Sequence, residues 1–173
     1  FMIRPDKANS ITEAIRMCFL VINNLKNIIK QKGESTSVGD EGGFAPMIND
    51  NEDALKLIIK AIEKAGFKNG KDVSICLDVA ANELFKNKKY SIHSKKFITT
   101  DKTIDKYLKL IKKYKIKSIE DPFAEDDWLS WNKFMKILWS KEFVSKLSKM
   151  TGFEELNLKH MNFMYARKNG FQN

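Results

Sequence analysis

Two acidic side chains, Asp78 and Glu120, stand where they could hold a metal ion. Each ends a short apolar run that is typical of a buried strand, and α/β proteins place their sites at the carboxyl ends of such strands. Two adjacent carboxylates repel each other unless a cation shares them, and oxygen ligands of this kind favour Mg²⁺. The alternative is that each carboxylate only caps the loop after its strand. Spacing alone leaves both interpretations open.

Glu41 is a third candidate, because it lies in the glycine-rich segment 39–43. Glycine can adopt backbone conformations that are closed to other residues, so this loop could lie close to a ligand. A carboxylate held there could donate or accept a proton during catalysis. Acidic residues also commonly form the turns of such segments, so a purely structural role is the alternative.

The elements that must position these residues are predicted to be helices that alternate with short strands. The first helix begins at the capping box Ser10–Glu13 and ends before Gly33. Further helices are expected at residues 51–65, from 100 and from 128, with buried strands at 73–80 and 116–119 and a small excursion near 90–98. This alternation predicts an α/β fold with a parallel sheet, either open or closed into a barrel.

The composition bounds the class of protein. The chain has 173 residues, of which 43% are hydrophobic and 31% charged, as in a globular domain. None of its apolar runs reaches the roughly 18 residues that a membrane-spanning helix needs, so no membrane partner is expected. The two cysteines, Cys18 and Cys76, fall in predicted buried elements, which indicates a reducing, cytoplasmic setting rather than a disulfide framework.

The formal net charge of +9 allows an alternative function of a different class. A basic, non-catalytic module could bind RNA or an acidic surface. The lysines are scattered along the predicted helices, however, which is typical of a solvated face. We find no zinc-finger spacing or RNP-like aromatic pair, so a nucleic-acid partner is not favoured.

Four sequence blocks resemble the enolase family, in the same order and at similar intervals. Residues 37–46 resemble its glycine-rich catalytic loop, residues 77–85 its first metal-ligand strand and residues 118–128 its second. Residues 1–5, with the helix after them, resemble the segment just ahead of that loop. The resemblance implies an incomplete enolase-type (β/α)8 TIM barrel, which in that family is the C-terminal catalytic domain.

The resemblance also implies a function. Enolases are lyases (phosphopyruvate hydratases) that dehydrate 2-phosphoglycerate to phosphoenolpyruvate in glycolysis, with Mg²⁺ as cofactor. The resemblance implies that Asp78 and Glu120 are Mg²⁺ ligands, and that Glu41 is the carboxylate that assists loss of hydroxide. Family members are cytoplasmic and form homodimers or larger oligomers, which is the expectation for this protein.

The resemblance divides the chain into two parts. Residues 1–135 are expected to form a fragment of the enolase C-terminal barrel domain. Residues 136–173 are expected to be an unrecognised basic tail that carries +4 of the net charge of +9. A frameshift or a rearrangement would produce it, and a genuine new extension is the alternative. No block matches the family's third metal ligand, its lysine base or its phosphate loop, and the chain begins at Phe1. We therefore expect a missing upstream segment and a chain that is inactive by itself.

Overall fold

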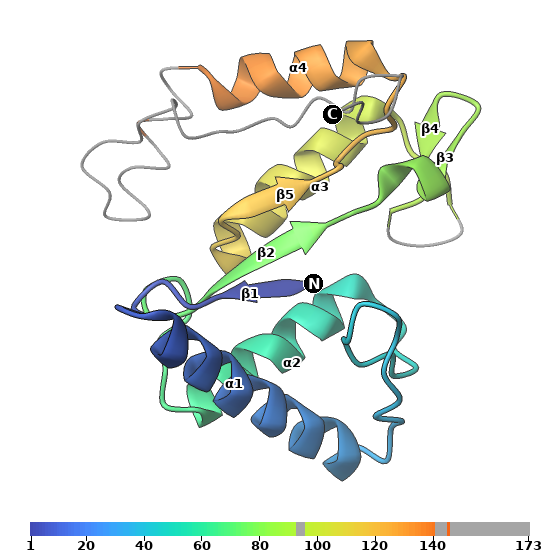
Figure 1. Ribbon diagram of the computed structural model, residues 1–173. Helices are drawn as coiled ribbons and strands as arrows, with labels where there is room; N and C mark the ends of the chain where they lie inside the picture. Colours follow the sequence, from blue (N-terminus) through green and yellow to red (C-terminus); the bar gives the residue numbers. More distant parts are fainter. Residues whose placement is uncertain (93–95, 141–144, 146–173) are drawn as a thin grey trace, which may run out of the picture.

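The computed structural model describes residues 1–92, 96–140 and 145, which form an α/β structure on a three-stranded sheet (Figure 1). The strands lie in the order β1 (Met2–Arg4), β2 (Ser74–Asp78) and β5 (Ser118–Glu120). The long helices are α1 (Ile11–Gln31), α2 (Asn51–Lys64), α3 (Thr100–Tyr114) and α4 (Trp128–Leu138). After β2 come a short 3-10 helix η1 (Ala81–Leu84) and a hairpin of β3 (Phe85–Lys86) and β4 (Lys89–Tyr90). Most of the predicted tail lies outside the described residues.

Helix α1 begins and ends as its sequence predicts. The Ser10 hydroxyl accepts a hydrogen bond from the Glu13 amide at 3.1 Å, and the Glu13 carboxylate accepts one from the Asn9 amide at 2.9 Å. The first bond satisfies an amide that has no partner within the first turn of the helix, and the second ties the Glu13 side chain to the residue before the cap. At the other end Gly33 has a φ of 76°, a left-handed conformation that glycine adopts at low cost after a helix.

The first apolar core lies between the sheet and the helix pair α1 and α2. One stripe of each helix faces inward, as amphipathic helices require. The side chains buried there include Met17, Val21, Ile28, Leu55, Ile58, Ile62 and Ile75. Full burial of a side chain of this size contributes about 1.5–3 kcal/mol. This core supports one face of β2.

A second core is aromatic and lies under the loop that joins β5 to α4. Phe123 belongs to this loop, and its ring lies 5.5–5.9 Å from four others, those of Tyr90, Tyr107, Trp131 and Phe134. The four pairs meet edge to face, an arrangement that aromatic rings prefer. The loop after β5 is thereby anchored to the β4 hairpin and to α3 and α4.

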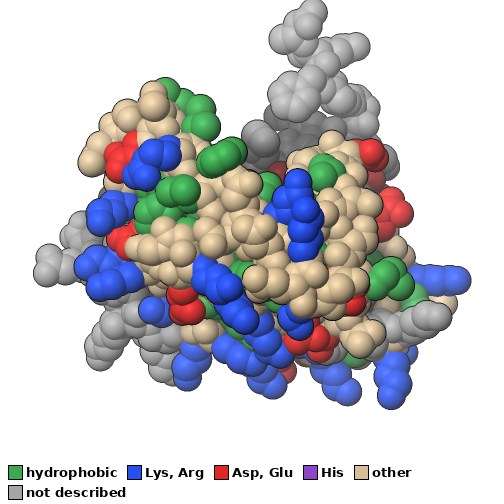
Figure 2. Space-filling view, turned by 90° about the horizontal axis from the view of Figure 1, so that it is seen from below, with side chains coloured by type: hydrophobic (Ala, Val, Ile, Leu, Met, Phe, Trp, Pro, Cys, Tyr) green, Lys and Arg blue, Asp and Glu red, His purple; other side chains and the backbone are tan. Residues whose placement is uncertain are grey.

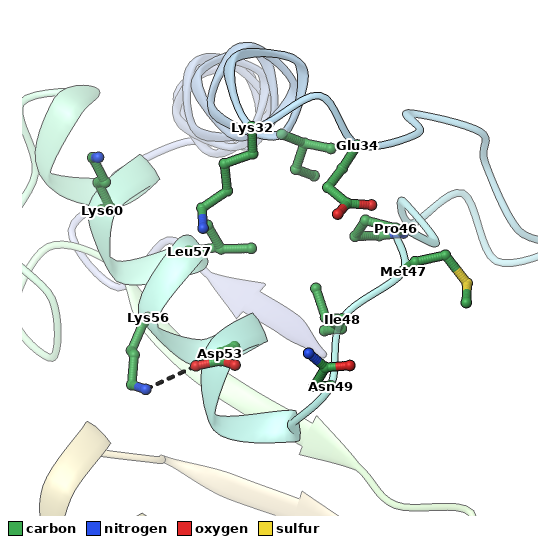
Figure 3. A pocket seen from close by; sticks show the side chains of 11 residues that line it. Lys32, Glu34, Pro46, Met47, Ile48, Asn49, Asp53, Lys56, Leu57 and Lys60 are labelled. Carbon is green, nitrogen blue, oxygen red and sulfur yellow. Dashed lines mark hydrogen bonds and ion pairs between the residues drawn. The ribbon is translucent and has the colours of Figure 1, made fainter.

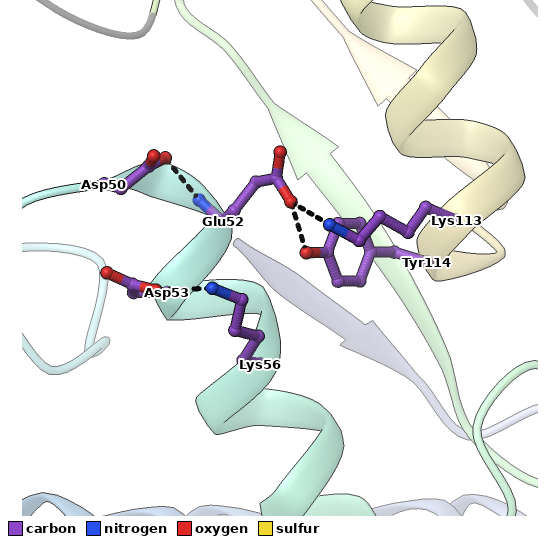
Figure 4. A network of polar contacts seen from close by, with 6 residues as sticks. All are labelled: Asp50, Glu52, Asp53, Lys56, Lys113 and Tyr114. Carbon is purple, nitrogen blue, oxygen red and sulfur yellow. Dashed lines mark hydrogen bonds and ion pairs between the residues drawn. The ribbon is translucent and has the colours of Figure 1, made fainter.

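A polar network joins α2 to α3 (Figure 4). The Glu52 carboxylate on α2 accepts hydrogen bonds from Lys113 Nζ and from the Tyr114 hydroxyl of α3, both at 2.5 Å. These two bonds, that from Lys113 first, lower the pKa of the Glu52 carboxyl from its ordinary value. Asp50 caps the same helix end, because its Oδ1 accepts the Glu52 amide at 2.9 Å. The network fixes the start of α2 against the end of α3.

The sheet is mixed, which corrects the prediction of a parallel sheet. β2 and β5 are parallel, as expected, but β1 was not predicted and pairs antiparallel to β2. The reason lies in the connections. One helix between two strands makes them parallel, whereas the consecutive helices α1 and α2 return the chain in the opposite direction. Within the described part of the chain the sheet stays open, as expected for an incomplete barrel.

The predicted boundaries of the other elements differ from the structure by a few residues. The second helix ends at Lys64 rather than at 65, and the strands are Ser74–Asp78 and Ser118–Glu120 rather than 73–80 and 116–119. The hairpin of β3 and β4, with a bridge between Tyr90 and Ile98, accounts for the predicted excursion. Over the described residues, no helix is both long and apolar enough to cross a membrane.

Candidate metal and catalytic site

The carboxylates of Asp78 and Glu120 end two neighbouring strands. The two residues are partners in the parallel register of β2 and β5, after the pairs Cys76–Ser118 and Leu77–Ile119. Neighbouring strands lie about 4.8 Å apart, and paired residues point to the same face of a sheet. Both residues are exposed. The structure therefore brings the two predicted ligands together at an edge that solvent and ions can reach.

The pleat of β2 directs Asp78 away from the apolar core. Ile75 and Leu77 join the core formed with α1 and α2, so Cys76 and Asp78 belong to the opposite face. On β5, Ile119 packs against the apolar cores, and Glu120, the next residue, points to the other side. Because successive side chains of a strand point to opposite faces, the side chains that pack in the apolar core lie on one face of each strand and the carboxylate lies on the other.

The backbone turns sharply after each carboxylate. Ala80 and Asp121 have φ values of 48° and 44°, in the left-handed region that residues with a Cβ seldom adopt. Such conformations cluster at functional sites and persist only where the surroundings hold them. The Val79 amide donates to the Glu120 carbonyl at 3.0 Å, and the Ala81 amide to the Asp121 carbonyl at 3.2 Å. The backbone pairing between these two segments therefore continues past the ends of β2 and β5.

Asp78 does cap the loop after its strand, as the alternative to metal binding predicted. Its Oδ1 accepts a hydrogen bond from the Ala80 amide at 3.1 Å, which supports the turn. A carboxylate has a second oxygen and spare acceptor capacity, so a cap of this kind leaves room for a metal. Asp127 has a structural role of the same kind, because it caps α4 by accepting the Ser130 amide.

Glu41 lies in a tight turn at the tip of its loop. The Gly42 amide donates to the Gly39 carbonyl and the Gly39 amide to the Gly43 carbonyl, both at 2.9 Å. Gly42 has a φ of 82°, which explains the glycine at that position. The loop joins α1 to α2 at the end of the sheet where β2 and β5 finish (Figure 1). Glu41 belongs to this loop and is exposed, and its catalytic role stays a prediction.

The structure unites two of the three predicted site residues. In the described ranges, no group of three or more His, Cys, Asp or Glu side chains could hold a metal, so Glu41 does not join the pair. Two exposed carboxylates in register still fit a hard divalent cation, since Mg²⁺ commonly takes one or two protein carboxylates and completes its shell with water and substrate oxygens. The donor set therefore fits Mg²⁺ as a partial site.

Sequence reasoning missed the residues that join the two strand-end loops. The Asn82 side-chain oxygen accepts the Glu125 amide at 2.8 Å, and the Tyr90 hydroxyl donates to Asp127 Oδ2 at 2.6 Å. The partners lie 43 and 37 residues apart in the chain. No local pattern marks such pairs, so only the fold reveals them.

A cavity of about 480 Å³ lies apart from these residues, between the end of α1, the segment 46–49 and α2 (Figure 3). Its lining combines apolar side chains, such as Ile29 and Leu57, with charged side chains of both signs. Asp53 and Lys56 pair with each other at 2.8 Å. This mixture favours no particular ligand charge.

Basic side chains are spread over the surface. In the view of Figure 2, Lys and Arg side chains alternate with acidic and hydrophobic ones. Several of the lysines are in ion pairs, such as Lys113 with Glu52 and Lys7 with Asp72 at 3.7 Å. This distribution matches the solvated helix faces that the sequence indicates.

Comparison with known proteins places the chain in a family. The family model described as "Enolase, C-terminal TIM barrel domain" matches residues 1–145. The enolase of Pelagibacter ubique (strain HTCC1062) is 62% identical over 162 residues, which are 94% of this chain and 39% of that protein. The enolase of Natranaerobius thermophilus (strain ATCC BAA-1301 / DSM 18059 / JW/NM-WN-LF) is 48% identical over 134 residues, or 77% of this chain and 31% of that protein.

These matches confirm the resemblance and the fold class. The chain spans about two fifths and one third of the lengths of these two relatives. The alternative of a basic binding module is not favoured. The family match continues ten residues past Met135, and the division of the chain there stays a prediction. The family model covers more than half of the chain, and the sequence therefore belongs to the enolase C-terminal TIM barrel domain family.

Proposed function

We propose that this chain supplies part of the active site of an enolase, a lyase that dehydrates 2-phosphoglycerate to phosphoenolpyruvate. The observation that carries the proposal is the register of β2 and β5, which pairs Asp78 with Glu120 at the carboxyl edge of the sheet. Family membership supports the reaction, and the edge is where barrels carry their catalytic residues.

The reaction breaks the C2–H bond and the C3–O bond of the substrate, forms a C2–C3 double bond and releases water. Asp78 and Glu120 would hold Mg²⁺, which when bound supplies positive charge against the carboxylate as C2 loses its proton. Glu41 gives a proton to the departing C3 hydroxyl, so that this group leaves as water. The base that takes the C2 proton is a lysine by resemblance, and we assign it to no residue of this chain.

We also propose a cytoplasmic location and a homodimeric assembly for the whole protein. Cys18 and Cys76 are free thiols, which supports a reducing compartment. The homodimer rests on the resemblance to the family. Size measurement by light scattering and localisation of a tagged protein test the two proposals separately.

A chimera tests the proposed function. Residues 1–145 of this chain replace the matching segment of the Pelagibacter ubique enolase, and dehydration of 2-phosphoglycerate is measured with Mg²⁺. We expect the chimera to be active, and Asp78→Ala in it to lower kcat/KM by more than about 100-fold, because loss of even an outer partner of a metal ligand costs about 10–100-fold. The matched control is Asp126→Ala, an exposed carboxylate six residues after Glu120 in the chain. A folded, inactive chimera, or an active one indifferent to Asp78→Ala, would contradict the proposal.

A further inference from the structure

The Tyr90 hydroxyl bridges two loops that follow the carboxylate strands. Tyr90 lies on β4, in the hairpin after β2, and is fully buried. Its hydroxyl donates to Asp127 Oδ2 at 2.6 Å and accepts the Ala124 amide at 3.2 Å. Ala124 and Asp127 both belong to the connection between β5 and α4. One side chain thus joins the segment after Asp78 to the segment after Glu120.

Further contacts fix the Tyr90 ring itself. The ring lies 4.7 Å from that of Phe85, within its own hairpin, and 5.5 Å from that of Phe123, in the opposite loop. Burial, and then the hydrogen bond to Asp127, raise the pKa of the Tyr90 phenol well above its ordinary value. The hydroxyl is therefore protonated at neutral pH, as its role as donor to Asp127 requires.

The strand ends need such support. β2 and β5 have five and three residues, so few ladder hydrogen bonds hold them together. Two carboxylates in register repel each other. Ala80 and Asp121 have the left-handed conformations described above, and these persist only when surrounding contacts impose them. Contacts between the two loops are the means by which the fold can hold the carboxylates close together.

We propose that Tyr90 is a positioning residue for the Asp78–Glu120 pair. Tyr90 joins the loops after β2 and β5, and in this way it holds the two carboxylates at a separation that one divalent cation can bridge. The effect on metal binding rests on the proposed function. The joining of the two loops does not, and the experiment separates them.

The first measurement needs no metal. In the 173-residue chain, hydrogen exchange is followed at the Val79 and Ala81 amides, which bond across to the β5 side. Tyr90→Phe keeps the ring and removes the hydroxyl. The matched control is Tyr114→Phe, which loses a hydroxyl bond of the same kind to Glu52 between α2 and α3. We expect exchange to be about tenfold faster in Tyr90→Phe than in the control, the effect of about 1.4 kcal/mol in local opening.

The second measurement is Mn²⁺ affinity of the same proteins, by electron paramagnetic resonance of the free ion. Tyr90→Phe is expected to weaken binding several-fold, and Tyr114→Phe to leave it unchanged even if both variants melt earlier. Asp127→Ser keeps the ability to cap α4 but is too short to reach the hydroxyl, so it should behave like Tyr90→Phe.

The outcomes are distinct. Unchanged exchange at both amides in Tyr90→Phe and Asp127→Ser would overturn the joining of the loops. Faster exchange with unchanged Mn²⁺ affinity would overturn the positioning role. A parent chain that binds no Mn²⁺ would overturn the metal assignment on which that role rests, while exchange would still decide whether Tyr90 joins the loops. If Tyr90→Phe fails to fold, the same two readouts in Asp127→Ser decide the proposal.

Discussion

Single residues in this chain act through their partners. Asp78 and Glu120 form a candidate site because the register of two strands pairs them. Glu52 links two helices because Lys113 and Tyr114 both donate to one of its oxygens. Like charges on adjacent strands are unfavourable unless a counter-charge is supplied, whereas opposite charges that share hydrogen bonds are favourable. Among the described residues, the chain therefore keeps an acidic group with a paired counter-charge between two helices, and a pair of carboxylates without an ion pair at the sheet edge.

The Glu52 network predicts a pH dependence of stability. Because the folded pKa of Glu52 is lowered from its ordinary value of 4.5, the ionised form stabilises the fold above that pH. This contribution is lost as the pH falls from about 4.5 through the folded pKa. We expect Glu52→Gln to flatten the acid limb of stability in urea titrations from about pH 3 to 7, a range that extends to both sides of the ordinary carboxyl pKa of about 4.

The matched control for this prediction is Asp53→Asn. Asp53 is adjacent to Glu52 on α2, and in the described part of the chain its ion pair is a local one, with Lys56 three residues later. An acid limb in Glu52→Gln as steep as in the parent would show that the network adds nothing to stability. Equal flattening in both variants would assign the effect to general charge rather than to the contacts of Glu52.

The elements show which parts of the fold could be predicted from the sequence. Helix α1 was predictable because the capping box at Ser10 and Glu13 and the glycine at 33 act locally. β2 and β5 were predictable from apolar runs that end in a carboxylate. β1 was not, since three residues carry no usable periodicity and its pairing with β2 spans about 70 residues. The candidate site shows the same difference between local and distant signals. Asp78 and Glu120 could be predicted because each ends an apolar run, whereas the role of Tyr90 depends on a partner far away in the chain.

The N-terminal cap of α1 predicts a measurable loss of stability. Ser10→Ala removes the oxygen that accepts the Glu13 amide. The expected cost is about 1 kcal/mol in the free energy of unfolding, within roughly 0.5–2 kcal/mol for caps of this type. Chemical denaturation followed by circular dichroism measures it. The control Ser35→Ala removes a hydroxyl whose bonds lie within an exposed loop, and it should cost less. Equal losses would contradict the capping role.

At the scale of the whole molecule, the chain corresponds to one part of the length of its relatives. It spans 39% of the Pelagibacter ubique enolase and carries two paired carboxylates, with Glu41 in a loop at the same end of the sheet. Catalysis by proton abstraction also needs a base of matched pKa beside the substrate. The sequence blocks of this chain that resemble the family include none for that base.

The 173-residue chain alone is therefore expected to give no turnover of 2-phosphoglycerate. A coupled assay at saturating Mg²⁺ measures it, with Glu41→Gln as the reference for background. Activity of the parent above this reference would show that the chain, or an assembly of its copies, supplies the missing base. Equal, baseline rates in both proteins are the expected result.

The most direct test of the central claim is a Mg²⁺ titration of the chain by calorimetry. Asp78 and Glu120 are expected to bind the ion weakly and together, because two carboxylates leave most of the octahedral shell to water. Asp78→Ala and Glu120→Ala should each abolish the binding heat, whereas Asp126→Ala, an exposed acidic residue close by in the chain, should leave it nearly unchanged. Tight binding that survives the loss of either strand-end carboxylate would contradict the placement of the metal site.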